Sequence, residues 1–215
     1  MTDERRRQRR RTWVVGGILL VLSAVVGFVA RFELSSFSGA REVLWALGVL
    51  ILVIGLGRAG SITGRRPIAT TVVLLQLALA STPMLNLLSS LTPEIPGNPN
   101  AEEDAWGALM LPYYAVLFLI TVAAVLLIGF VDALPRPWSW APAWVLVGSG
   151  IAMAALIMVT FADAAAVPRR ILFEVPGTGV MLLGILAVVL AIRAGRTEDA
   201  DALGPSRPAP SIGGA

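Results

Sequence analysis

The chain of 215 residues is 56% hydrophobic and 14% charged, and its mean hydropathy is +0.79. A soluble domain would be about 45–50% apolar and about a quarter charged, so this composition is typical of a membrane protein. The sequence contains no Cys and no His, which excludes disulfides, thiolate or imidazole metal sites, and catalysis by a thiol or an imidazole.

The first predicted element is a helix over residues 13–30, and an arginine run lies directly before it. The run RRRQRRR, from Arg5 to Arg11, contains six arginines. Basic residues beside a span orient membrane proteins and are attracted to the anionic lipid headgroups of the cytoplasmic leaflet. We therefore interpret the run as a topogenic signal next to anionic lipid headgroups. Specific lipid recognition is the alternative, and we expect no nucleic-acid partner.

Five further apolar runs follow at residues 40–57, 68–91, 108–131, 143–162 and 173–192. A helix needs about 20 apolar residues to cross the hydrocarbon core of a bilayer. The run at 40–57 is the weakest, because it is short and carries Arg41 and Glu42 near its start. None of the runs alternates apolar and polar residues as a barrel strand would. The sequence predicts an all-α integral membrane protein with a bundle of six transmembrane helices.

The distribution of arginines predicts the orientation. With the N-terminus in the cytoplasm, 13 of the 17 arginines face the cytoplasm, six from the N-terminal run and seven from later loops and the tail. The positive-inside rule then favours an N-in/C-in topology. The predicted organisation is a cytoplasmic Arg-rich segment at 1–12, a transmembrane domain at 13–192 and a disordered cytoplasmic tail at 193–215. We expect the protein to lie in a bacterial cytoplasmic membrane.

The third predicted span, at 68–91, carries most of the polar side chains inside a span. Six of its polar residues share one arc of the helix, opposite Thr70 and Ser81: Thr71, Gln76, Thr82, Asn86, Ser89 and Ser90. Because an amide facing lipid is costly, we expect this arc to face the bundle interior. Pro83 cannot donate to the Leu79 carbonyl and should kink the helix. The arc serves either hydrogen bonds between helices or the wall of a polar cavity that opens outward.

A second polar group is predicted at the outer end of the fifth span. Asp163 lies near that boundary, and Arg169 and Arg170 follow it on the outside, against the orientation bias. These arginines either pair with nearby acids or bind an anionic headgroup or solute, for which the guanidinium fork is suited. We predict that the two polar groups converge around one outward-facing cavity. The predicted substrate-binding residues are Gln76, Thr82, Asn86, Asp163, Arg169 and Arg170.

Small residues also recur on one face of several spans, as with Gly16 and Gly27 in the first, and Gly177 and Gly184 in the sixth. Such faces let helix backbones approach closely in lipid. They serve either packing within the bundle or docking of a partner membrane protein. The repeat alone does not separate these two roles.

Known intramembrane catalysts require residues that this sequence lacks, so we predict no enzyme, no catalytic residue, no cofactor and no metal. A Ser–His dyad is impossible without His, and Asp132 and Asp163 fall at opposite membrane faces, too far apart for a paired-aspartate protease. The favoured function is a non-enzymatic accessory or interaction subunit. The alternative is a small-molecule transporter or substrate-binding membrane subunit with an outward-facing polar pocket. A water-filled cavity beside the third span favours the alternative, and a dry packed contact favours the accessory role.

Overall fold

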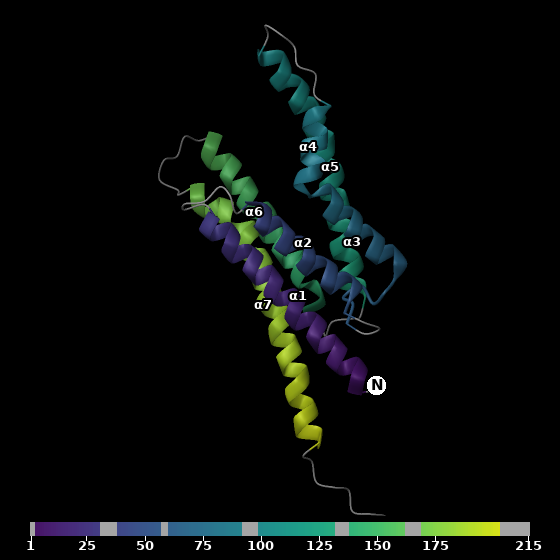
Figure 1. The fold of residues 1–215 in the computed structure, drawn as a ribbon. Helices are drawn as coiled ribbons and strands as arrows, with labels where there is room; N and C mark the ends of the chain where they lie inside the picture. Colours follow the sequence, from purple (N-terminus) through teal and green to yellow (C-terminus); the bar gives the residue numbers. More distant parts are fainter. Residues whose placement is uncertain are drawn as a thin grey trace, which may run out of the picture.

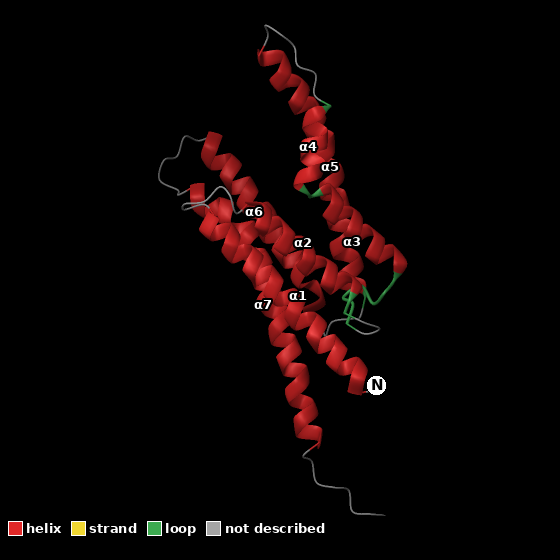
Figure 2. Ribbon diagram, in the orientation of Figure 1, coloured by secondary structure: helices red, strands yellow, loops and turns green. Residues whose placement is uncertain are grey.

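The computed structural model describes residues 3–30, 38–56, 60–91, 99–131, 138–161 and 169–202, and every regular element in these ranges is helical (Figures 1 and 2). The elements are α1 (Asp3–Ala30), α2 (Ser38–Ile54), α3 (Pro67–Leu79), α4 (Thr82–Ser90), α5 (Pro99–Phe130), the short 3₁₀ helix η2 (Trp138–Trp140), α6 (Ala141–Phe161) and α7 (Arg169–Ala202). The predicted all-α class is confirmed.

Four helical segments, in α1, α5, α6 with η2, and α7, are long and apolar enough to cross a membrane. The pair α3 and α4 adds a fifth if the bent pair is one span. Large apolar side chains lie on the outside of the helices, where Leu111 is 75% and Met158 71% exposed. Lipid covers such surfaces in a bilayer, and the long apolar helices indicate a multi-pass membrane protein.

The helix lengths therefore support four or five spans, whereas the sequence predicted six. The difference lies in two places. Helix α2 has 17 residues, which is about 25 Å at 1.5 Å per residue and less than the hydrocarbon thickness of about 30 Å. The third predicted span is not one helix, because α3 and α4 meet at a bend of 57°.

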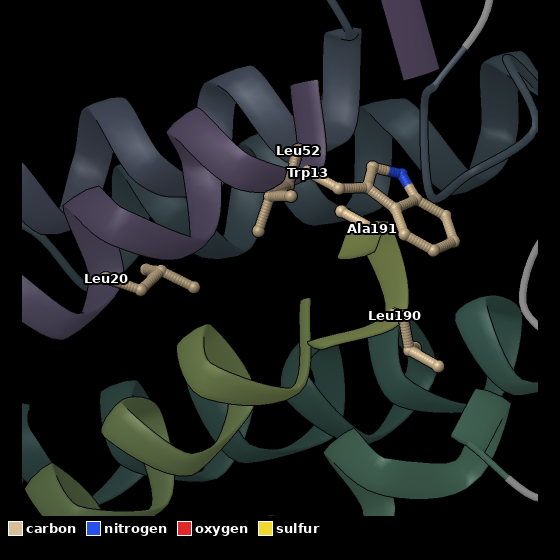
Figure 3. Packing of buried hydrophobic residues seen from close by; sticks show 5 residues of the cluster. All are labelled: Trp13, Leu20, Leu52, Leu190 and Ala191. Carbon is tan, nitrogen blue, oxygen red and sulfur yellow. The ribbon is translucent and has the colours of Figure 1, made fainter. Parts of the chain in front are cut away.

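Helix α1 is the centre of the packing, because it lies along both α2 and α7, while α7 also packs on α6 and α3 packs on α5. Figure 3 shows the main core cluster, in which α1, α2 and α7 contribute buried side chains: Trp13, Leu20, Leu52, Leu190 and Ala191. The core thus joins the first helices of the chain to its last.

Glycines allow these close helix contacts. A Cβ built on Gly17 would lie 2.6 Å from the carbonyl oxygen of Gly184, so α1 and α7 touch backbone to backbone there. A Cβ on Gly48 would lie 3.2 Å from the carbonyl oxygen of Gly16, which brings α2 against α1. These small residues therefore pack helices of this chain against one another, as small residues do in lipid.

The arginine run is helical, because α1 begins at Asp3. Just after the run, the Trp13 indole N–H donates to the Gly60 carbonyl at 2.8 Å, and the Thr12 hydroxyl accepts the Leu56 N–H at 2.9 Å. Both bonds hold the start of α1 against the segment between α2 and α3. We call this end of the bundle, where α1 begins and α7 ends (Figure 1), the arginine-rich end.

The tail that was expected to be disordered from Arg193 is helical as far as Ala202. The segment RAGRTEDADA holds three alanines beside Arg and Glu and no proline, and these residues favour helix. The proline-rich end of the tail, at 203–215, lies outside the described residues.

Candidate functional site

The candidate site is built around the break between α3 and α4. Ala80 ends α3 with φ −77° and ψ 3°, and Ser81 is extended with φ −86° and ψ 149°. Pro83 follows in the first turn of α4, where a missing N–H costs nothing. The predicted kink at Pro83 is therefore confirmed, as a two-residue break in the helix.

The break frees the Leu79 carbonyl, as predicted, and Tyr113 of α5 satisfies it. The Tyr113 hydroxyl donates to the Leu79 carbonyl oxygen. An unsatisfied backbone carbonyl within a membrane costs several kcal/mol, so a donor from a neighbouring helix stabilises the broken geometry. The bond also joins α3 to α5 at the level of the break.

Glu42 of α2 accepts hydrogen bonds from the first residue of α4. Its Oε1 accepts the Thr82 backbone N–H at 2.7 Å, and its Oε2 accepts the Thr82 hydroxyl. The Ser81 side chain, in the usual capping position, makes no capping bond. A carboxylate at a helix N-terminus also interacts favourably with the helix dipole. A charged residue from a different helix therefore holds α4 in place.

A cavity of about 580 Å³ lies beside this cap. We call it the Arg41 cavity. It is lined by the ends of α1, α2 and α7 that lie away from the arginine-rich end, and by the break between α3 and α4. Its lining includes Ser23, Gly27, Arg41, Glu42, Thr82 and Gly177.

The Arg41 side chain lies over Gly27. A Cβ on Gly27 would be 2.8 Å from Arg41 Cδ and 2.9 Å from Nε, so the stem of Arg41 packs on the bare backbone of α1. Among the described residues Arg41 makes no hydrogen bond or ion pair, while the neighbouring Glu42 carboxylate is engaged by Thr82. The Arg41 side chain is exposed and lines the cavity, so a ligand in the cavity would lie beside its guanidinium.

A second cavity, of about 430 Å³, lies at the centre of the bundle and is lined mainly by apolar side chains. We call it the central cavity. Trp45, Pro176 and Val180 line both cavities, so the two are neighbours. Gln76, Thr121 and Ser149 are its polar side chains, and the Thr121 hydroxyl donates to the Leu117 carbonyl of its own helix at 2.7 Å.

The predicted site residues are distributed over several places. Thr82 lines the Arg41 cavity and Gln76 lines the central cavity. Asn86 is exposed on α4. Arg169 and Arg170 begin α7, but their side chains and all of Asp163 lie outside what the structure describes. The convergence of all six residues around one cavity stays a prediction.

The single polar arc expected on the third span does not form, which corrects the sequence interpretation. Thr71 and Asn86 are exposed, and only Gln76 of the arc is partly buried. Asn86 lies beyond the 57° bend, which turns α4 away from the direction of α3, whereas Thr71 is on an exposed side of α3 itself. Ser89 and Ser90 instead donate to the carbonyls three residues before them, at 2.8 Å and 2.7 Å.

Sequence reasoning did not include Arg41, Glu42 and Tyr113 in the site. A signal for the first two was present, since Arg41 and Glu42 are charges at the start of an otherwise apolar run and Arg41 opposes the orientation bias. No signal pointed to Tyr113, because its role depends on which helix lies beside the break. Among the described residues no three acidic side chains cluster as a metal site would require.

The Arg41 cavity is thus lined by one cation, Arg41, by the Glu42 carboxylate that caps α4, and by several small residues. Such a lining suits noncovalent binding. Comparison of the chain with family models, with curated proteins and with solved structures finds no match.

Proposed function

We propose that this protein is a multi-pass membrane protein that binds a small molecule in the Arg41 cavity, as a transporter or a substrate-binding membrane subunit. The cavity itself carries the proposal. Its volume of about 580 Å³ falls within the range of about 300–1,000 Å³ that small-molecule sites occupy. Its lining combines small residues and Trp45 with a few polar groups that can orient a ligand.

The proposed orientation makes this cavity outward-facing. The arginine-rich end is cytoplasmic by the positive-inside rule, and the Arg41 cavity lies at the other end of the bundle. Six passes are proposed, with α2 as a short pass and α3 plus α4 as one broken pass. A short span is tolerated when the bilayer thins or flanking residues reach the interface. The proposed location is a bacterial cytoplasmic membrane.

The broken third pass supports binding rather than simple packing. Transporters place substrate sites at interrupted helices, whose free backbone ends and helix termini point at the ligand. Here the break at Ala80 and Ser81 borders the cavity, and Ala80 and Thr82 are part of its wall. The break is therefore held by Tyr113 and Glu42 and borders a space that water or a ligand can fill.

The test asks whether water and solutes reach the cavity from outside. Because the chain has no native Cys, one introduced cysteine reports on one position. Gly177 lines the cavity, and a Cβ built on it would meet no atom within 4 Å, so there is room for the side chain of Gly177→Cys. We expect a membrane-impermeant maleimide to label it in intact cells.

The matched control is Gly148→Cys, also at a helical glycine with open space around it but not among the residues that line the Arg41 cavity. We expect it to resist the reagent. If Gly177→Cys also resists labelling while it folds and inserts normally, the cavity is dry and the binding function is wrong.

A second function, the accessory or interaction subunit, is favoured by one observation. Helix α7 runs to Ala202 and projects past the other described helices at the arginine-rich end (Figure 1). A polar helical arm on the cytoplasmic side suits contact with a soluble or peripheral partner. Two results together would favour this role: a dry Arg41 cavity, and loss of the protein's cellular function when the chain is truncated after residue 192.

A further inference from the structure

Beside the Arg41 cavity lies a smaller space, of about 300 Å³, between α1 and α7. We call it the Phe28 groove. Phe28 is 54% and Val25 45% exposed, so the groove lies on the side of the helices that hydrocarbon would cover. Gly27, Arg41 and Gly177 line both the groove and the cavity.

The two helices are in close contact at their middle and border the groove toward this end. At Gly17 and Gly184 α1 and α7 touch, since a Cβ on Gly17 would lie 2.6 Å from the Gly184 carbonyl oxygen. At Gly177 a Cβ would meet nothing within 4 Å. The groove therefore lies at the end of the helices that holds Arg41, and the bare backbone of Gly177 leaves room in it.

Arg41 belongs to both spaces. Its stem packs on Gly27, and the side chain lines both the Arg41 cavity, which also holds Glu42 and Thr82, and the more apolar Phe28 groove. A cation at such a boundary matches a molecule that carries an anionic group on a hydrocarbon chain. A guanidinium pairs well with phosphate or carboxylate oxygens, and an apolar groove accepts the chain.

We propose that the ligand of this site is an anionic amphiphile that enters from the lipid between α1 and α7, with its anionic group at Arg41 and its hydrocarbon chain along the Phe28 groove. This inference rests on the proposed binding function and specifies the class of ligand and its route. A soluble anion that enters only from the water would use Arg41 but not the groove.

The experiment compares three probes on the full chain in nanodiscs of neutral phosphatidylcholine, with empty nanodiscs as background. Dodecyl phosphate has both the anion and the chain, dodecylphosphocholine has the chain without net charge, and inorganic phosphate has the anion alone. We expect dodecyl phosphate to bind at least about tenfold more tightly than either of the others, as expected for one charge-assisted contact.

Two variants separate the roles of charge and groove. Arg41→Gln should weaken dodecyl phosphate binding by about tenfold, because it removes the cation. Gly177→Leu should weaken it as well, because a large side chain fills the space between α1 and α7. Gly148→Leu, at an equally open helical glycine away from the groove, is the control and should bind as the native chain does. Circular dichroism and size exclusion confirm that each variant is folded.

Each contrary result is decisive. Equal binding of inorganic phosphate would show a soluble anion as ligand, and equal binding of dodecylphosphocholine would show that charge is not recognised. Unchanged binding in folded Arg41→Gln would remove Arg41 from the site. If Gly177→Cys is labelled from outside but dodecyl phosphate does not bind, the binding function stands and the amphiphile inference is wrong.

Discussion

Glu42 and Thr82 lie 40 residues apart in sequence, and the carboxylate of the first accepts both the backbone N–H and the hydroxyl of the second. This contact fixes the start of α4 to α2. Because the Ser81 side chain makes no capping bond, the geometry of the break depends on a residue from another helix.

Replacement of Glu42 by Ala should destabilise the protein by about 1 kcal/mol, since α4 loses its cap and a favourable charge at its N-terminus. Thermal unfolding of the purified chain in detergent measures the change. Glu42→Gln, which keeps an acceptor oxygen, should cost less. Asp104→Ala, at an exposed carboxylate beyond the first turn of α5, is the control for loss of a surface carboxylate. Equal stability of Glu42→Ala and the control would show that the cap contributes nothing.

Tyr113→Phe should cost about 1 kcal/mol, because the Leu79 carbonyl loses its donor. Tyr114→Phe, at a neighbouring tyrosine that is 55% exposed, should be neutral. The cost should shrink in a Pro83→Ala background, since alanine has a backbone N–H that can donate to the Leu79 carbonyl in a continued helix. A double-mutant cycle on denaturation midpoints measures this coupling. Additive effects would mean that Tyr113 and Pro83 do not act on the same carbonyl.

Gly17→Ala should destabilise the bundle by about 1–3 kcal/mol, because the new methyl group would collide with the backbone of α7 and force the two helices apart. Its Cβ would lie 2.6 Å from the Gly184 carbonyl oxygen. Gly150→Ala, whose Cβ meets nothing within 4 Å, should be neutral or slightly stabilising. The unfolding midpoints of the two variants give the comparison. A neutral Gly17→Ala would show that α1 and α7 are not in contact there.

Reporter fusions test the proposed orientation. A reporter placed after residue 192 should read cytoplasmic, and one within residues 95–104 should read external, as the positive-inside rule requires. Replacement of the exposed Arg5, Arg7, Arg10 and Arg11 by Gln should produce a mixture of orientations. Arg9 is left in place, because its guanidinium stacks 4.4 Å from the Trp13 ring centroid. A cytoplasmic signal from 95–104 in the native chain would reverse the whole arrangement.

The sequence by itself determined the helical class and the approximate place of each helix. Apolar runs must form helices in lipid, because the backbone has no other partner for its hydrogen bonds. It also determined the break near Pro83 and the freed Leu79 carbonyl, because a missing N–H has the same consequence in any fold.

Only the tertiary structure decided which residues complete the break and surround the cavity. Tyr113 and Glu42 act across 34 and 40 residues of sequence, and no local pattern reports such distances. The polar arc of the third span was wrong because one helical wheel placed residues from both sides of the predicted kink, and the wheel contains neither the angle nor the direction of the 57° bend. A helical wheel gives the face of a residue only up to the next bend, and beyond it neighbouring helices decide what that face meets.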